Sequence, residues 1–195
     1  MTPVKASSYI VLLASLIALC SCSNVNVETS DNFEVVELPD GSVAYLNHNS
    51  SITYDEAFNP RAVEIQGEIF LRVSAQRTPF IVSAELGEIT VLGTEFNVKS
   101  DTKRIEVEVE EGVVELKTKG HNNKIRRGEF AVYKNAEDII QKGRAEFKFK
   151  IWMDDLKREF KKLGKEIKTS SKKIGEESEE TGKELKQELK KLKIK

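Results

Sequence analysis

The sequence predicts an all-β domain followed by a long, charged helical segment, and two observations support this fold class. Between residues 33 and 143, short apolar runs alternate with turn formers, and no stretch longer than about ten residues has the 3.6-residue period of a helix. From residue 144 onward, lysine and glutamate dominate, and apolar residues recur at helical spacing. We therefore expect one β core, built as a closed sandwich or as a solenoid-like stack of short strands, and then a helical tail.

Residues 1–21 have the features of a bacterial export signal. The apolar run that ends at Leu19 is shorter than the roughly 20 residues that a membrane-spanning helix needs. Cys22 has Leu19 three positions before it and Ser21 directly before it, which resembles the processing site of lipoproteins, where the cysteine carries the lipid. We therefore predict a lipoprotein-type signal peptide over 1–21, lipidation of Cys22, and a flexible tether over 22–32. This places the domain in the cell envelope, lipid-anchored on the periplasmic side of a membrane, and an uncleaved anchor is the alternative.

The β domain is predicted to span residues 33–143. Its clearest part is RIEVEVEEGVVELKT, in which Ile105, Val107 and Val109 alternate with glutamates, the two-residue period of strands with one solvated face. Turn formers separate the other runs, including HNN at residues 121–123. These other runs are FEVVEL, SVAYLN, SITY, AVEIQG, EIFLRV, PFIVSA, EITVLG, EFNV and EFAVY.

Four residues are predicted to specify turns of this domain. Asp40 and Gly41, in LPDGS, supply the side chain and the positive φ that a tight hairpin needs. Gly93 lies between two apolar segments, where a residue without Cβ allows a bulge or a close backbone approach, and Gly112 does the same for a hairpin. The phenylalanines predicted as core anchors are Phe70, Phe80, Phe96 and Phe130.

Five sequence blocks of this region follow, in order, the landmarks of the FecR domain, and the chain resembles that family over about residues 35–134. The blocks are LPDGSVAYLNHNSSITY, VEIQGEIFLRV, PFIVSAELGEITVLGTEFNV, VEVEEGVVEL and RRGEFAVY. The resemblance implies a periplasmic all-β sensor in envelope signalling that takes part in regulating a sigma factor, and it favours the solenoid-like stack.

The resemblance also implies how the protein would act. Longer members of the family place a sigma-binding segment in the cytoplasm before a transmembrane helix, whereas only MTPVKASS precedes the apolar run of this chain. We therefore expect a membrane-tethered accessory that contributes to anti-sigma-type regulation through other proteins, such as an envelope receptor. The alternative is a structural or binding envelope lipoprotein whose helical tail mediates assembly.

The tail, residues 144–195, contains four consecutive blocks of eleven residues that begin at Trp152. Eleven residues over three turns keep an apolar stripe on one face of a nearly straight helix. We predict a helix over about 151–169, a frayed segment, and a second helix to about 193. The stripe could dock on the β domain, on a second helix in an oligomer or on a membrane surface, or it could stay in solvent. It consists of Trp152, Leu156, Phe160, Leu163, Ile167, Leu185 and Leu189.

Composition argues against several classes of function. The formal net charge of −1 does not suit a nucleic-acid-binding protein. His48 and His121 lie in predicted turns, and the chain has no phosphate-binding loop and no cluster with metal-ligand spacing. We therefore expect no enzymatic activity, no cofactor and no metal.

Overall fold

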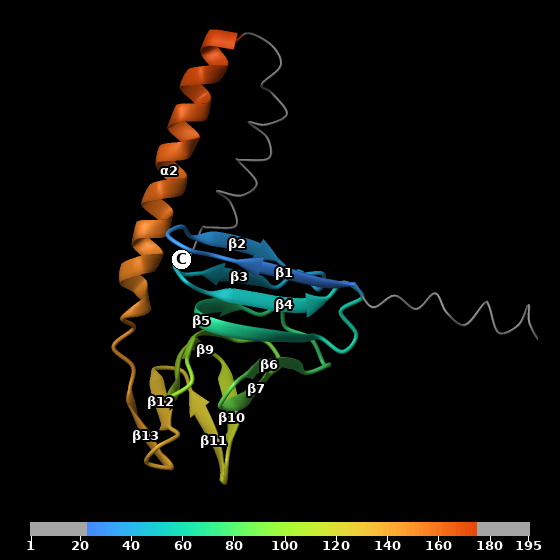
Figure 1. Cartoon of the computed structure of the whole chain (residues 1–195), viewed down its shortest axis with the longest axis vertical. Coiled ribbons are helices and arrows are strands. Elements are labelled where there is room, and N and C mark those ends of the chain that lie inside the picture. Colours follow the sequence, from blue (N-terminus) through green and yellow to red (C-terminus); the bar gives the residue numbers. More distant parts are fainter. Residues whose placement is uncertain (1–22, 175–195) are drawn as a thin grey trace, which may run out of the picture. The chain divides into compact units, whose positions relative to one another are not determined.

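The computed structural model describes residues 23–174, with side chains as far as residue 166, and divides into two compact units between Gly143 and Arg144 (Figure 1). The first unit holds the β-strands, and the second holds the helix α2, Phe149–Ile174. The predicted fold class, a mainly β domain followed by a helical segment, is confirmed. Within the described part of the chain, no helix combines the length and the apolar content that a bilayer crossing requires.

The described residues form thirteen strands that belong to one continuous sheet. In chain order they are β1 Asn24–Glu28, β2 Glu34–Glu37, β3 Val43–Leu46, β4 Ser51–Asp55, β5 Ala62–Arg72, β6 Phe80–Ala84, β7 Gly87–Val91, β8 Glu95–Ser100, β9 Arg104–Glu111, β10 Val113–Thr118, β11 His121–Arg126, β12 Glu129–Lys134 and β13 Ile139–Arg144. Most connections between them are short.

The long strand β5 divides this sheet into two halves. Its first residues pair with β4 and β6, and its residues from Gly67 onward pair with β3 and β8. We call the row β1-β4-β5-β6-β7-β10-β11 the first half-sheet and the row β2-β3-β5-β8-β9-β12-β13 the second half-sheet. Gly67 has a φ of +85°, and a Cβ atom there would lie 2.6 Å from the carbonyl oxygen of Asn49, so β5 can bend at this point only with glycine.

One hydrophobic core fills the space that the bent sheet encloses. Side chains alternate along each strand, so Ile69 and Leu71 of β5 and Ile105, Val107 and Val109 of β9 are buried in this core. The outermost strands of the two half-sheets also approach each other, because Lys142 of β13 donates a hydrogen bond to the carbonyl oxygen of Lys124 in β11 at 2.6 Å. The sheet is therefore nearly closed. Of the two arrangements expected from the sequence, this agrees with the closed one and not with an open, solenoid-like stack of strands.

Three of the four predicted anchor residues, Phe70, Phe80 and Phe96, are fully buried, and two of them lie in the core that the bent sheet encloses. Phe80 and Phe96 are fully buried there. Phe70 alternates with Ile69 and Leu71, and its ring lies 6.0 Å from that of Tyr45 on the other face of the second half-sheet. Phe130 is only partly buried. Ala131, the next residue of β12, points into the core, so Phe130 lies on the opposite face of the strand.

The structure corrects two local predictions. Residues 22–32 are not a tether throughout, because Asn24–Glu28 form β1 and pair with β4 from Asn24 opposite Asp55 to Glu28 opposite Ser51. The alternation of Val25 and Val27 was too short to stand out among asparagines, which are poor strand formers. Residues 121–123 begin β11 instead of forming a turn, because they pair with Leu116–Thr118 of β10.

Helix α2 contains the predicted helix 151–169 and begins two residues earlier. Trp152, Leu156, Phe160 and Leu163 follow one another at spacings of four, four and three residues, which places them on one face. Phe149 and Met153 widen this face in its first turns. Ile167 lies in the helix beyond the last described side chain, and Cys22, Leu185, Leu189 and the predicted second helix lie outside the described residues.

Candidate interaction site

A buried ion pair holds the turn that contains Asp40. The Nη2 atom of Arg61 lies 2.6 Å from Oδ2 of Asp40, Nε lies 2.9 Å from the same oxygen, and both side chains are about nine-tenths or more buried. Arg61 also donates to the carbonyl oxygens of Ser74, at 2.9 Å, and Thr78. This one guanidinium therefore joins the turn at residues 38–42, the start of β5 and the loop before β6.

The turn itself uses both predicted residues. Oδ1 of Asp40 accepts the N–H of Ser42 at 2.9 Å, and Gly41 has a φ of +80°. The hydroxyl of Ser42 accepts the N–H of Ser74 at 3.0 Å, so the turn is bonded to the loop that follows β5. Asp40 therefore acts on tertiary structure as well as on its own turn, whereas Gly41 supplies the positive φ of the turn.

Gly93 and Gly112 lie next to each other where the chain passes between the half-sheets. A Cβ atom on Gly93 would lie 2.6 Å from the Cα of Ala75, so a close backbone approach, with no positive φ, accounts for this glycine. Gly112 has a φ of +91°, and a Cβ there would lie 3.0 Å from the carbonyl oxygen of Gly93. The pairing of β8 with β9 is irregular close by, between Glu95 and Phe96.

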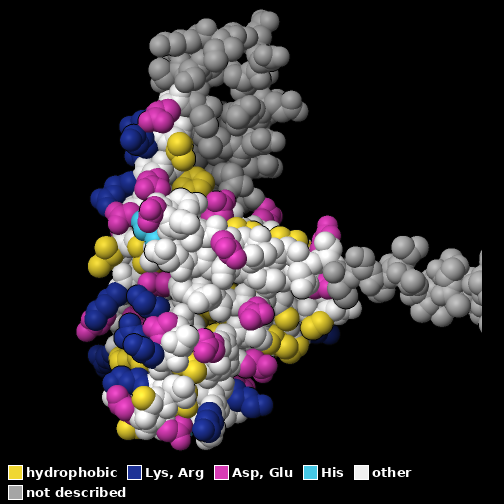
Figure 2. Space-filling model, viewed as in Figure 1, with side chains coloured by type: hydrophobic (Ala, Val, Ile, Leu, Met, Phe, Trp, Pro, Cys, Tyr) yellow, Lys and Arg dark blue, Asp and Glu magenta, His cyan; other side chains and the backbone are white. Residues whose placement is uncertain are grey.

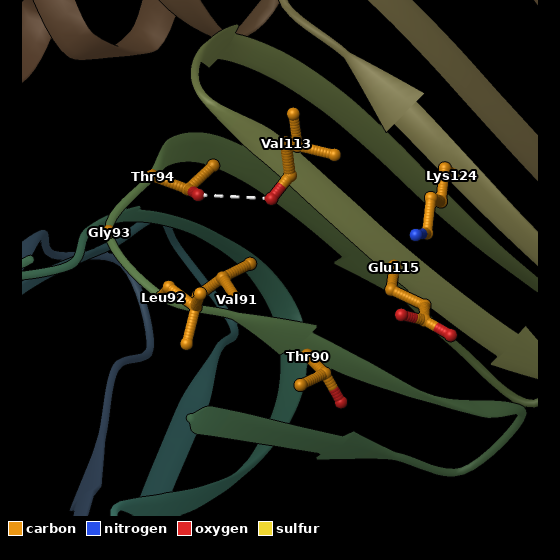
Figure 3. Close-up of a pocket in the computed structure, with 8 residues that line it drawn as sticks. All are labelled: Thr90, Val91, Leu92, Gly93, Thr94, Val113, Glu115 and Lys124. Atoms are coloured by element: carbon orange, nitrogen blue, oxygen red, sulfur yellow. Dashed lines mark hydrogen bonds between the residues drawn. The ribbon is translucent and has the colours of Figure 1, made fainter. Parts of the chain in front are cut away.

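A groove of about 380 Å³ opens beside these glycines (Figure 3). Strands β7 and β10 pair only as far as Thr90 opposite Glu115. Beyond that pair both chains turn toward the second half-sheet and separate, and the hydroxyl of Thr94 closes the gap by donating to the carbonyl oxygen of Val113 at 3.1 Å. The groove is lined by Thr90, Val91, Leu92, Gly93, Thr94, Val113, Glu115 and Lys124.

The groove combines an apolar centre with a charged end. Leu92 is 54% exposed and Val113 is 47% exposed, and both of these large aliphatic side chains line the same groove. Lys124 lies directly across from Glu115 in the pairing of β10 with β11, and Glu115 accepts a hydrogen bond from Asn122 at 2.9 Å. Such a surface suits an extended protein segment that carries an apolar side chain next to a charged one.

The sequence analysis did not identify this groove. Val113 and Val114 are adjacent, so strand alternation requires one of them to face away from the core, and that was the available signal. The separation of β7 from β10 depends on pairing between distant segments, which no local pattern shows. Within the described residues, no group of three or more His, Cys, Asp and Glu side chains is arranged to hold a metal.

A second polar cluster joins the far ends of the two half-sheets. The hydroxyl of Tyr133 donates to Oδ1 of Asp138 at 3.0 Å, and Nε2 of His121 lies 3.2 Å from the carbonyl oxygen of Asp138. Loss of solvation, and then the neighbouring Asp138, raise the pKa of Tyr133 above its usual value. The cluster links β11 to the turn between β12 and β13, which is a structural role.

Comparison with known proteins shows that part of the chain is similar to one family. Residues 25–115 match the family model described as FecR protein, a range that includes every groove residue except Lys124. No curated protein matches the chain. Two crystal structures of a candidate anti-sigma factor from Parabacteroides distasonis ATCC 8503, at 2.50 and 1.65 Å resolution, are similar to it with TM-scores of 0.60 and 0.59 and 28% identity in both cases. The matches cover 63% and 62% of this chain, which spans about 60% of the length of those proteins.

Proposed function

We propose that the protein is a binding module in the regulation of a sigma factor, because its residues 25–115 match the FecR family model. Two observations support the proposal. The similar solved structures are those of a candidate anti-sigma factor. The groove between Leu92 and Val113 lies in the family region, and both of these apolar side chains are about half exposed.

The proposal includes a lipid anchor on Cys22 and a position on the periplasmic side of a membrane. The apolar run before Cys22 and the lipobox-like residues Leu19 and Ser21 support it. A protein held there regulates a sigma factor through other proteins, because the sigma factor itself is cytoplasmic. The partner is then a regulatory protein with a segment exposed outside the membrane.

The geometry of the groove sets the strength of such binding. Burying one leucine-sized side chain between Leu92 and Val113 contributes about 1.5–3 kcal/mol, and a charged neighbour that pairs with Lys124 adds about 0–1 kcal/mol. Binding through the groove alone is therefore weak. Confinement of both partners to one membrane raises their effective concentration and compensates for that weakness.

Transcript analysis of a deletion strain tests the proposed role. Deletion of the gene is expected to change a set of sigma-dependent transcripts, and re-expression of the wild-type protein should restore them. Leu92→Glu should fail to restore them, because the carboxylate makes the groove polar while the exposed position keeps the folding cost within about 0.5 kcal/mol. Ile139→Glu is the matched control, because Ile139 is also 47% exposed but lies outside the groove. Full restoration by Leu92→Glu would contradict a function of the groove.

The apolar face of α2 favours a second candidate function, a structural envelope lipoprotein that self-associates through its helix. Leu163 on that face is 49% exposed. In this case deletion leaves sigma-dependent transcripts unchanged, and sedimentation of the purified protein shows an oligomer that Leu163→Glu dissociates. A monomer in sedimentation would remove this candidate.

A further inference from the structure

The described part of the chain begins directly at the first strand of the β domain, with no linker between them. The carbonyl oxygen of Ser23 accepts the N–H of Glu56 at 2.9 Å, and β1 begins at the next residue, with Asn24 opposite Asp55. Cys22 is joined to Ser23 by a single peptide bond, so their Cα atoms are about 3.8 Å apart. Whatever is attached to Cys22 is therefore held within a few ångströms of the turn that follows β4.

The pairing of the strands shows what else lies at this end. Across the first half-sheet, Tyr54 pairs with Val63, Ala62 with Ile81, and Phe80 with Val91. The start of β1, the end of β4, the starts of β5 and β6 and the end of β7 therefore form one row. Neighbouring strands are about 4.8 Å apart, so the row extends over about 20 Å.

Four apolar residues are exposed along this row, beside the polar Asn24, Asn59 and Arg77. We define the rim as Ala57, Pro60, Pro79 and Leu92, which are all exposed. Figure 2 shows hydrophobic side chains on the surface near the point where the described chain begins. Prolines lack an N–H group that would need a hydrogen-bonding partner, so such a rim loses little when water leaves it.

We propose that the rim contacts the lipid surface. The end of the first half-sheet at which β1 begins then faces the membrane. The inference depends on the proposed lipid at Cys22, and adds an orientation and a contact surface to it. Asp55 and Glu56 lie in the same turn, so the contact does not require anionic lipids. Because Leu92 belongs to both the rim and the groove, the groove opens beside the membrane and receives a partner segment that lies close to the bilayer.

Depth-dependent quenching of a fluorophore tests this orientation. The full-length protein is purified from membranes with Ala57→Cys or, as the control, Asp31→Cys, and each is labelled with one environment-sensitive dye. Asp31 lies beyond the far end of β1, about 15 Å or more from Asn24 along the strand. After reconstitution into phosphatidylcholine vesicles with a quencher in the headgroup region, the dye at residue 57 is expected to be quenched several-fold more than the dye at residue 31.

A linker variant and a mass measurement separate the possible failures. Ten glycine and serine residues inserted between Cys22 and Ser23 reach about 17 Å, and the difference between the two dyes should then disappear. If both dyes are equally quenched without the linker, the orientation is wrong while the anchor stands. A difference that persists with the linker would show that the rim itself holds the domain on the lipid surface. If the mass of the amino-terminal peptide shows no lipid on Cys22, the anchor and the orientation are both wrong.

Discussion

Replacement of Arg61 by methionine tests whether the buried ion pair holds the domain together. The substitution keeps an aliphatic chain near the ring of Phe80, which lies 5.5 Å from the guanidinium carbon. It leaves the carboxylate of Asp40 buried, with the hydroxyl of Ser42 at 2.9 Å as the remaining bond to Oδ2. Removing one partner of a buried pair costs about 3–5 kcal/mol, which is a large part of the stability of a domain of this size.

The expected loss is measurable by two methods. Each kcal/mol lowers the melting temperature of such a domain by about 3–5 °C, so Arg61→Met should melt about 10–20 °C below the wild type. Urea unfolding followed by circular dichroism gives the free energy of unfolding, and the slope with denaturant should stay unchanged. Lys134→Met is the matched control, because it breaks an exposed pair with Glu137 and should cost less than about 1 kcal/mol.

A double-mutant cycle makes the test specific. Asp40→Asn leaves the cation without its counter-charge, and combining it with Arg61→Met removes both charges. The double variant should be more stable than the sum of the two single losses predicts, with a coupling free energy between about 0.5 and 3 kcal/mol. A loss below about 1 kcal/mol for Arg61→Met, or no coupling, would refute the role given to this pair.

Two further substitutions test local features. Gly93→Val should unfold the domain, because even its Cβ atom would lie 2.6 Å from the backbone of Ala75, and unchanged thermal melting would contradict this. For Asp101, hydrogen bonds from the backbone N–H of Lys103 and then of Arg104 lower the carboxyl pKa below 3.8 in the folded protein. The charge of Asp101 therefore stabilises the fold above about pH 4, and this contribution is lost as the pH falls through the lowered pKa. Asp101→Ala should cost less than about 1 kcal/mol at pH 7, with the difference shrinking toward pH 2 in urea titrations, and a constant difference would contradict the assignment.

The strands that the sequence predicted well are those in which local pattern and tertiary environment agree. In β9, Ile105, Val107 and Val109 alternate with glutamates, and the structure buries these three side chains. AVEIQG and EIFLRV were separate runs, but they form the single strand β5, because Gly67 bends the strand without ending it. β1 was missed because its hydrogen-bonding partner, β4, stabilises a segment whose own composition is unfavourable for a strand.

The candidate site was less accessible to sequence reasoning than the fold. Gly93 stood out as a residue without a side chain, but its neighbour Ala75 lies 18 residues earlier in the chain, and only the structure shows that the two touch. The exposure of Leu92 and Val113 depends in the same way on where β7 and β10 separate. Local periodicity gives the face of a strand, whereas a groove requires knowledge of which strands are neighbours.

The membership of β5 in both half-sheets has a consequence for how the domain can be divided and how it can fold. Shifting β5 by one residue would turn its own side chains to the wrong face in both halves, so the two registers are set together or not at all. Neither half-sheet is a unit that evolution or an experimenter can remove, and a fragment that ends at residue 115 would cut β10 within the strand. With its many contacts between distant residues, the domain is expected to fold slowly and in one step, after the whole β region has become available.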